Sequence, residues 1–338
     1  MRILLILSLL FLVACKQTPK QYAAKIQFET MGTFGTVKLV DSFSIDDKKI
    51  ARDIDSLFIH FNLSLSTYID SSTLSRYNSG ESVELDNYIY HCLNVSEKIF
   101  EETNGAFNPH RKAIFDYWKY LQGPIDSSFI DSLKMQSIYF LRYDTISLID
   151  PVSLPEKHGV NAIFPIGLDF SAIAKGYGVD VIAFYLDSLG IENYMVEIGG
   201  EVHCKGKNED GNFWRLGIEE PNEETRSIYE VVQLENRAMA TSGNYRNFKV
   251  LENGQKVVHI INPKTGYPEI SNLLSASILA DDCMLADAYA TACMVMGVDT
   301  CFQFVLNHPS LDCYLIYTDE NGNLQSKCTD GFKKILVE

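Results

Sequence analysis

Gly167-Leu-Asp-Phe-Ser-Ala-Ile-Ala-Lys-Gly-Tyr-Gly-Val-Asp180 is the stretch from which the fold can be read most directly. Apolar residues continue from it at helical spacing, which predicts a helix over Ser171–Leu189. Asp169 precedes this helix and Ser171 is placed to cap it, so the amides of the first turn are predicted to point outward. Such a helix start, with Lys175 one turn later, favours phosphate binding. The simpler alternative is a capped helix with a surface lysine, and the segment is no P-loop because G-x-x-x-x-G-K-[ST] is absent.

Further helices and strands lie on both sides of this segment. Apolar spacing predicts helices over about Asp46–Phe61, Asp86–Thr103 and Met284–Met296. The predicted strands are Thr36–Val40, Tyr194–Ile198, Trp214–Ile218, Ser275–Leu279 and Cys313–Tyr317, and Asn-Gly turns at 253–254 and 321–322 mark two hairpins. Because helices and strands interleave irregularly, the predicted fold class is α+β, a single mixed α/β body rather than a regular βαβ ladder.

Length and charge narrow the class of protein. The chain has 338 residues, 46% of them hydrophobic, with a formal charge of −15. These values are typical of a globular protein with a large core. The acidic balance disfavours nucleic acid as a partner. An anionic ligand remains possible, because a divalent cation can reverse the local charge.

The N-terminus predicts export and lipid attachment. Arg2 precedes an apolar run of eleven residues, Ile3–Val13, and Ala14 leads to Cys15. This order is typical of a bacterial export signal, and a cysteine at the cleavage point resembles a lipoprotein signal. The run is too short for a membrane span, which needs about 20 residues. We therefore expect a signal peptide over 1–14, lipidation of Cys15, a tether over 15–25 and one catalytic domain over 26–338.

The cysteines give little further direction. There are eight, and seven remain if Cys15 carries lipid, so at least one free thiol or an intermolecular bond is expected. No C-x-x-C pair is present, which disfavours a zinc ribbon or a thioredoxin-like site. Cys293 and Cys313 stand among apolar residues and are expected to be small buried hydrophobic side chains.

Three more segments combine glycine with polar groups. Glu197-Ile-Gly-Gly-Glu201 follows a predicted strand, and its glycines allow either close approach to a ligand or a simple turn. Ala240-Thr-Ser-Gly-Asn-Tyr-Arg246 is followed by His259-Ile-Ile-Asn-Pro-Lys-Thr-Gly266. His259 ends a predicted hairpin strand and is a candidate general base, although a lone histidine is more often structural.

The last such segment is Leu285-Ala-Asp-Ala-Tyr-Ala-Thr291. Asp287 and Thr291 are four residues apart on a predicted helix, so their oxygens share a face. A carboxylate and a hydroxyl beside small residues favour a hard cation such as Mg²⁺. The alternative is that Thr291 bonds its own helix backbone while Asp287 faces solvent.

Taken together and in this order, these segments resemble the ApbE-type FAD:protein FMN transferases. The resemblance also includes Met31-Gly-Thr33, Leu65-Ser-Thr-Tyr68 with Ser72-Thr-Leu-Ser75, and Gly105-Ala-Phe-Asn-Pro109. It implies Mg²⁺-dependent transfer of FMN from FAD to a threonine or serine hydroxyl of an acceptor protein, with release of AMP. It also implies acceptors that are membrane subunits of Rnf/Nqr-type redox complexes. Such acceptors agree with the predicted location, lipid-anchored in the cell envelope and facing the periplasm.

The resemblance assigns roles to individual positions. It implies flavin contacts at Met31, Tyr68, Ala106, Phe107, Asn108, Asp169, Lys175, His259 and Ile260. It implies a magnesium site made by the Ala172 carbonyl and the side chains of Asp287 and Thr291. Two positions depart from the family pattern: Asn108 replaces the usual Asp, which removes a charge beside FAD, and Thr73 replaces a usual Glu.

These roles suggest a mechanism. The acceptor hydroxyl attacks the FMN-side phosphorus of FAD, His259 is the expected base, and Asp287 is the residue expected to matter most. Three alternatives stay open. One is an FAD pyrophosphatase that gives FMN and AMP, and the second is a lipoprotein that binds FAD without catalysis. The third is a structural lipoprotein with accidental motifs, which would not bind FAD.

Overall fold

The computed structural model describes residues 22–41, 46–138, 167–222, 227–244, 248–251, 254 and 256–337. The predicted signal peptide (1–14) and Cys15 lie outside these residues. The first strand begins at Tyr22, because residues 22–25 pair with 38–41 of the next strand. Strand β1 therefore begins four residues before the predicted domain boundary at 26.

An antiparallel sheet of eight strands forms the centre of the protein, in the order β1-β2-β3-β4-β7-β10-β11-β12. Its strands are β1 Tyr22–Thr30, β2 Thr33–Asp41, β3 Tyr194–Ile198, β4 Glu201–Lys205, β7 Arg237–Gly243, β10 Leu273–Ala280, β11 Asp312–Thr318 and β12 Leu324–Cys328. Two separate ribbons pair β5 Trp214–Glu219 with β6 Ile228–Leu234, and β8 Phe248–Val250 with β9 Lys256–Val258.

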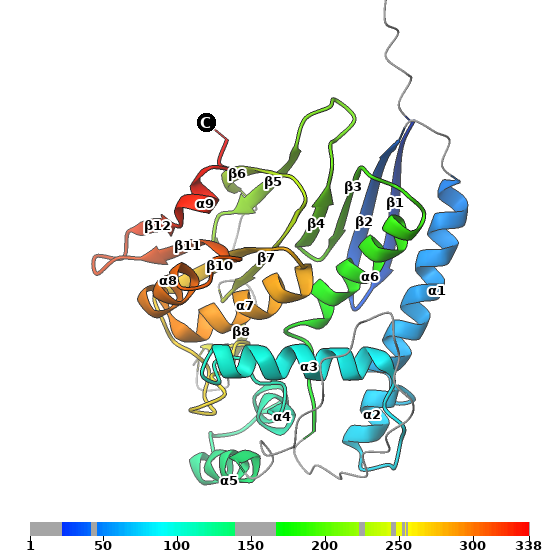
Figure 1. Cartoon of the computed structure of the whole chain (residues 1–338). Coiled ribbons are helices and arrows are strands. Elements are labelled where there is room, and N and C mark those ends of the chain that lie inside the picture. The colour runs from blue at the N-terminus through cyan, green and yellow to red at the C-terminus, as the bar shows by residue number, and fades with distance from the viewer. Residues whose placement is uncertain are drawn as a thin grey trace, which may run out of the picture.

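Helices cover one face of this sheet. Figure 1 shows α6 (Ala174–Ser188) and α7 (Cys283–Met296) against the central strands, α1 (Asp47–Leu65) beside β1, and α3 (Asn87–Glu102) crossing below. The shorter helices are α2 Thr73–Asn78, α4 Lys112–Tyr120, α5 Ser127–Ile138, α8 Val298–Leu306 and α9 Asp330–Lys333. In the described part of the chain, no helix combines the length and the apolar character needed to cross a membrane.

The two faces of the sheet carry side chains of different size. Successive residues of a strand point to opposite faces, so each strand contributes to both cores. On the helix side the central strands present small residues, among them Ala238, Ala240, Ala276 and Ala280. On the opposite side they present Met239, Leu279, Tyr314 and Ile316, which pack with Trp214 of β5 and Phe332 of α9. Small residues let α7 lie close to the sheet on the helix side.

A third, smaller core lies below these layers. It joins α4 and α5 to the β8–β9 ribbon through Ile114, Trp118, Ile130 and Val257. The indole Nε1 of Trp118 donates to the carbonyl oxygen of Gly266 at 2.7 Å, which fixes the turn after the ribbon. The segment that begins at His259 is therefore supported by the helical part of the molecule.

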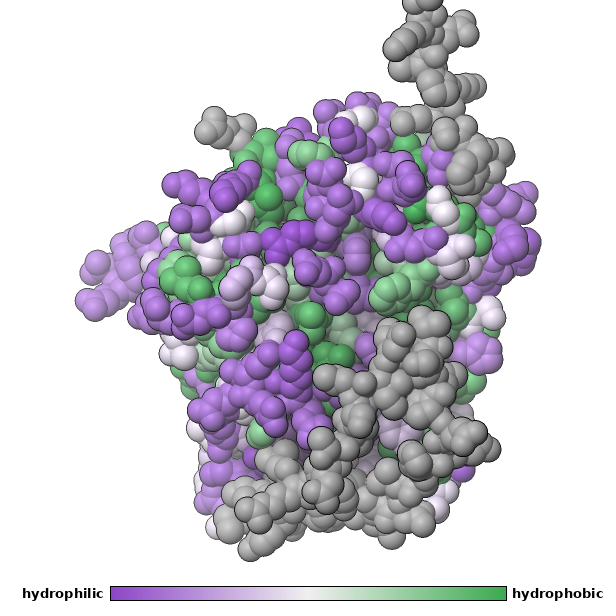
Figure 2. Space-filling model, in the orientation of Figure 1, coloured by the Kyte–Doolittle hydropathy of each residue, from purple (hydrophilic) through white to green (hydrophobic). Residues whose placement is uncertain are grey.

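The surface over α6, α7 and α3 is mostly polar. Figure 2 shows hydrophilic side chains over most of this face, with apolar side chains in small separate patches. Scattered apolar side chains are ordinary on a folded protein. The helices on this face therefore direct their apolar sides inward, toward the sheet.

The structure confirms the α+β class and the predicted helices and strands, with shifted ends. The predicted cap by Ser171 is wrong, because α6 begins only at Ala174 and its N-cap residue is Ile173, which makes no side-chain cap. The backbone N–H of Ser171 instead donates to Asp169 Oδ1 at 2.8 Å in a preceding turn. Cys293 is buried as predicted, but it forms a disulfide with Cys301.

Candidate active site

The closest approach between α6 and α7 occurs at Gly176. Its backbone N–H donates to Asp287 Oδ2 at 3.0 Å. A Cβ at position 176 would lie 2.3 Å from the carbonyl oxygen of Cys283 and 2.8 Å from Cβ of Asp287. Only glycine permits this contact, so the sequence Lys175-Gly176 is required by the helix packing.

Asp287 is held inside the protein by this contact. Its exposed fraction is 3%, and it lies in the middle of the alanine-rich helix α7. The alternative in which Asp287 faces solvent is therefore wrong. A buried carboxylate requires hydrogen-bond donors or a cation, and the Gly176 amide supplies one donor.

Lys175 and Glu201 form a second buried contact beside Asp287. Lys175 Nζ lies 2.5 Å from Glu201 Oε1, and the Glu201 side chain is 3% exposed. Burial alone would lower the pKa of Lys175, but Asp287 and Glu201 outweigh burial and raise that pKa above its usual value. The Lys175 ammonium is therefore held by Glu201 and is also attracted by the charge of Asp287.

Within this group of charged side chains, the environment of Glu201 is the least favourable to its charged form. Burial, and secondly the charge of Asp287, raise the pKa of Glu201 to about 8 even though Lys175 opposes the shift. Among the described residues, no hydrogen-bond partner is found for its buried Oε2. Two carboxylates therefore share one ammonium, and a cation here would offset the remaining negative charge.

Thr291 lies one turn after Asp287 and meets the sheet. Its Oγ1 is 3.2 Å from Oγ of Ser242 on β7, and the neighbouring Thr241 Oγ1 is 2.8 Å from Ser277 Oγ on β10. The hydroxyl of Thr291 thus faces the polar end of β7, within the segment that the sequence singled out. Arg246 of that segment lies outside the described residues.

Several predicted flavin contacts gather around the start of α6. Met31 lies in the β1–β2 turn with a φ of 49°, and its Cε would be 2.9 Å from a Cβ on Gly178. Ala106, Phe107 and Asn108 follow α3 and are buried. The backbone N–H of Asp169 donates to the carbonyl oxygen of Pro109 at 2.9 Å, which joins the segment after α3 to the segment before α6.

The remaining predicted contacts are more peripheral. Tyr68 is 76% exposed, and Lys119 Nζ lies 4.1 Å from the centre of its ring. His259 is exposed directly after β9, whereas Ile260 is buried in the same core as Ala106 and Phe107. An exposed histidine can be reached by a second protein, whereas Asp287 cannot.

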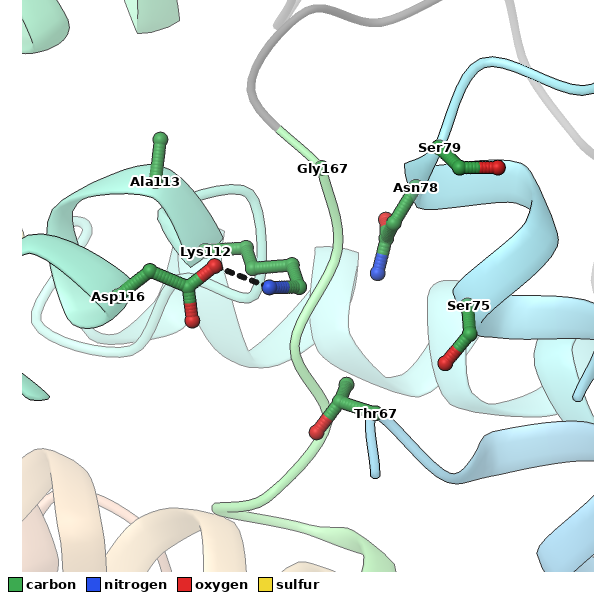
Figure 3. Close-up of a pocket in the computed structure, with 8 residues that line it drawn as sticks. All are labelled: Thr67, Ser75, Asn78, Ser79, Lys112, Ala113, Asp116 and Gly167. Atoms are coloured by element: carbon green, nitrogen blue, oxygen red, sulfur yellow. Dashed lines mark hydrogen bonds and ion pairs between the residues drawn. The ribbon is translucent and has the colours of Figure 1, made fainter. Parts of the chain in front are cut away.

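Two cavities flank these segments. One has a volume of about 320 Å³ and lies between α2 and α4, where the chain at Gly167 passes between Lys112 and Asn78 (Figure 3). Its side chains are polar, and Lys112 forms an ion pair with Asp116. The other, of about 350 Å³, includes Ala106, Asn262 and Lys264 in its lining and therefore borders the predicted flavin segments directly.

The oxygen atoms in this region fit a magnesium ion. Within the described ranges, no three His, Cys, Asp or Glu side chains group as a metal site. Mg²⁺ does not need such a group, because it keeps several waters or phosphate oxygens besides one or two carboxylates. Asp287 and Thr291 are candidate hard oxygen ligands, to which the resemblance adds the carbonyl of Ala172, and the buried Oε2 of Glu201 nearby has no hydrogen-bond partner among the described residues.

The sequence missed Glu201 and Gly176 as parts of this arrangement. Glu201 is the last residue of the Glu-Ile-Gly-Gly-Glu segment, and a carboxylate beside paired glycines was the sequence feature that could have indicated a place in the site. The role of Gly176 depends on how closely α7 approaches α6, and no local sequence pattern predicts that distance. Both residues act through contacts between segments far apart in the sequence.

Comparison with known proteins identifies the family of this chain. The sequence profile of the ApbE family matches residues 31–315. An FAD:protein FMN transferase of Vibrio cholerae serotype O1 is 36% identical over 300 residues, covering 86% of each chain. One from Haemophilus influenzae is 34% identical over 334 residues, covering 96% of this chain and 94% of the relative.

Solved structures show the same fold. The flavin transferase ApbE from Vibrio cholerae superposes with a TM-score of 0.78 at 30% identity, covering 94% of this chain and 100% of that one. The apo form of the Pseudomonas stutzeri flavinyl transferase ApbE has a TM-score of 0.77 at 22% identity, covering 93% of this chain and 97% of that one. On sequence and structure together, this chain belongs to the ApbE family.

Proposed function

We propose that this protein is an FAD:protein FMN transferase, which moves FMN from FAD to a threonine or serine hydroxyl of another protein and releases AMP. The observation that carries the proposal is the buried Asp287, with the half-buried Thr291 one turn later and Lys175 nearby, in a chain whose curated relatives bear that name. The bond from the FMN-side phosphorus to the pyrophosphate bridging oxygen breaks. The bond from that phosphorus to the acceptor oxygen forms.

FAD binds along the segments that meet at the start of α6. Met31, Tyr68, Ala106, Phe107, Asn108, Asp169, Lys175, His259 and Ile260 are the proposed contacts. The ammonium of Lys175, fixed by Glu201, places positive charge beside the phosphates. Asn108 is uncharged, and its Oδ1 accepts from the backbone N–H of His110 at 2.9 Å, so it contacts FAD through its remaining amide group.

Asp287, Thr291 and the carbonyl of Ala172 are the proposed ligands of Mg²⁺. When bound, the ion would neutralise negative charge that builds on the phosphates during transfer. Asp287 provides the charged ligand and is oriented by the Gly176 amide. Thr291 adds a neutral oxygen from the same helix face.

His259 is the proposed general base. A threonine hydroxyl is a weak nucleophile, so removal of its proton by a positioned base accelerates the attack. The exposed position of His259 after β9 supports this role, because the acceptor is a second protein that must reach the base from outside. His259 takes the hydroxyl proton, and AMP leaves with the bridging oxygen.

We also propose that the protein is lipid-anchored through Cys15 in the cell envelope and faces the periplasm. The disulfide Cys293–Cys301 supports this location, because disulfides persist in oxidising compartments. The acceptors we propose are membrane subunits of Rnf/Nqr-type redox complexes. A tether at the membrane raises the effective concentration of such acceptors around the site.

Incubation of the protein with FAD, MgCl₂ and a candidate Rnf-type subunit tests the function. We expect a flavin-fluorescent acceptor band on a denaturing gel and one AMP per flavin attached. An acceptor with its target threonine changed to alanine is the matched control and should stay unlabelled. AMP release at the same rate without any acceptor would indicate an FAD pyrophosphatase, and intact bound FAD would indicate a binding protein without catalysis.

A further inference from the structure

Helices α6 and α7 both begin without a cap from their own sequence. The N-cap residue of α6 is Ile173, which has no polar side chain, and the N-cap residue of α7 is Asp282, whose side chain makes no cap hydrogen bond. Both starts are buried, since Gly176, Cys283 and Met284 are inside the protein. Free N–H groups at a buried helix start are costly, so another partner is required.

A buried aspartate of each helix caps the other helix. Asp180 of α6 accepts from the N–H of Cys283 at 2.9 Å through Oδ1, and from the N–H of Met284 at 2.8 Å through Oδ2. Asp287 of α7 accepts from the N–H of Gly176 at 3.0 Å. Both carboxylates are 3% exposed. Negative charge at a helix start is favoured by the helix dipole, so the exchange stabilises both starts.

Two further pairs tie α6 to β4. Lys175 meets Glu201, and Asp180 Oδ1 lies 3.0 Å from His203 Nδ1. Glu201 and His203 are two residues apart on β4 and therefore point to the same side of the sheet. Asp180 thus lies at the junction of α6, α7 and β4.

We propose that Asp180 is the residue that positions Asp287, acting through the start of α7. Cys283 and Asp287 are four residues apart and lie on one face of the helix, so holding the amides of 283 and 284 fixes where the Asp287 carboxylate lies. Loss of the Asp180 carboxylate leaves two buried amides unpaired and lets α7 shift away from α6. The inference rests on the proposed function only in treating Asp287 as a ligand.

Hydrogen–deuterium exchange of the whole protein, without any ligand, tests whether each of the two helices caps the other. In Asp180→Ala we expect at least tenfold faster exchange at the amides of 283 and 284, and also at Gly176, whose own partner is Asp287. Alanine is a better helix former than aspartate, so α6 itself gains helix propensity and faster exchange at Gly176 must come through α7. Asp180→Asn keeps one acceptor and should give an intermediate effect.

Asp312→Ala is the matched control, because Asp312 is a partly buried carboxylate on β11 that accepts from Thr329 and Arg237. It should destabilise the fold without changing exchange at Gly176 relative to other core amides. Unchanged protection of Gly176 in Asp180→Ala, or equal loss in Asp312→Ala, would overturn the proposal.

Binding of MgCl₂ measured by calorimetry gives the second readout. We expect the Kd for Mg²⁺ to rise at least tenfold in Asp180→Ala and to stay within twofold in Asp312→Ala. In transfer assays kcat should fall while KM for FAD changes little. An unaltered Kd with lost Gly176 protection would overturn the positioning role. Absence of Mg²⁺ binding in the unmodified protein would instead contradict the proposed function, and the exchange result would still decide the reciprocal caps.

Discussion

The two faces of the central sheet are built from the same strands and differ in the size of the side chains that β7 and β10 present to each side. Toward the helices, β7 and β10 present Ala238, Ala240, Ala276 and Ala280. Toward β5 and α9, alternate residues of β7, β10 and β11 present large side chains, such as Met239, Leu279 and Tyr314. The same strands therefore contribute to two apolar cores, a larger one under the helices and a smaller one toward β5 and α9.

The difference shows what the small residues make possible. On the helix side, α7 approaches closely enough for backbone amides of one helix to reach carboxylates of another, as Gly176 reaches Asp287. On the opposite side, Trp214 and Phe332 fill the space and stabilise the fold by burial. We expect changes on the helix side to affect chemistry and changes on the opposite side to affect stability.

The largest effect is expected from Asp287→Ala. Loss of the charged ligand should reduce FMN transfer at least about 1,000-fold, which corresponds to about 4 kcal/mol in the barrier. The rate of acceptor labelling measures it, with circular dichroism to verify folding. Asp299→Ala is the control, because the Asp299 side chain is 94% exposed on α8. Near-normal labelling by folded Asp287→Ala would remove Asp287 from the mechanism.

Phe332→Ala should lower the stability of the fold and leave activity per folded molecule nearly unchanged, the opposite of Asp287→Ala. The Phe332 side chain is fully buried and packs on Tyr314, with ring centroids 5.4 Å apart. Its removal should lower the free energy of unfolding by about 3–5 kcal/mol. Urea unfolding measures this loss, and kcat per folded molecule should stay within about twofold. Phe213→Ala, at an exposed position, should change little. A kcat that fell with Phe332 would show that the two faces are coupled.

Gly176→Ala tests how closely α6 and α7 must approach. The added methyl group would overlap the carbonyl oxygen of Cys283, so the helices must separate, at a cost of about 1–3 kcal/mol. Thermal unfolding and transfer rate should both fall. Gly123→Ala is the control, because a Cβ there meets nothing within 4 Å. If both variants melted at the same temperature as the unmodified protein, close packing of the helices would not be required.

The smallest effect is expected from pH. Burial, and secondly Arg111, lower the pKa of His110 to about 4. In the unfolded chain the pKa is about 6.5. Between these values the unfolded chain binds more protons, so the stability that is complete above pH 6.5 is lost as pH falls toward 4. We expect this loss of stability to be concentrated in the region near His110.

The two tryptophans of the chain can report this difference. Trp118 lies in the small core with α4, whereas Trp214 lies in the apolar layer beyond the sheet. Fluorescence of Trp214→Phe, which retains Trp118, should change at a higher pH than fluorescence of Trp118→Phe. Coincident acid transitions in the two variants would contradict a local effect of His110.

Most of the helices and strands that position the site followed from the sequence, because their periodicity is strong. Apolar spacing placed α1, α3, α6 and α7, and β3 and β10 stood out as apolar runs. Short strands with mixed polar residues, such as β4, gave no such signal. The strand order was also beyond local patterns, because it depends on contacts between distant segments.

The candidate site was predicted in part. The i, i+4 spacing placed Asp287 and Thr291 on one helix face, and family resemblance supplied the flavin positions. The fixed state of Lys175 and the burial of Asp287 could not be predicted, because both depend on how α6, α7 and β4 meet. Ser171 was wrong as a cap because α6 begins only at Ala174, three residues later, and Ser171 lies in the turn before it. The disulfide joins Cys293 and Cys301 across the turn at Gly297, and the short spacing of these two cysteines was the sequence feature that could have predicted it.

The order of the strands also determines when the protein can fold. β2 pairs with β3 although about 150 residues separate them in the chain, and α1 to α6 lie in between. The β1–β2 hairpin is local and forms early, but its inner edge stays unpaired until the long intervening segment has collapsed. Contacts of such large sequence separation slow folding, and an unpaired strand edge is a site of aggregation meanwhile. We therefore expect the N-terminal hairpin to form early and to gain its protection only when β3 pairs with β2.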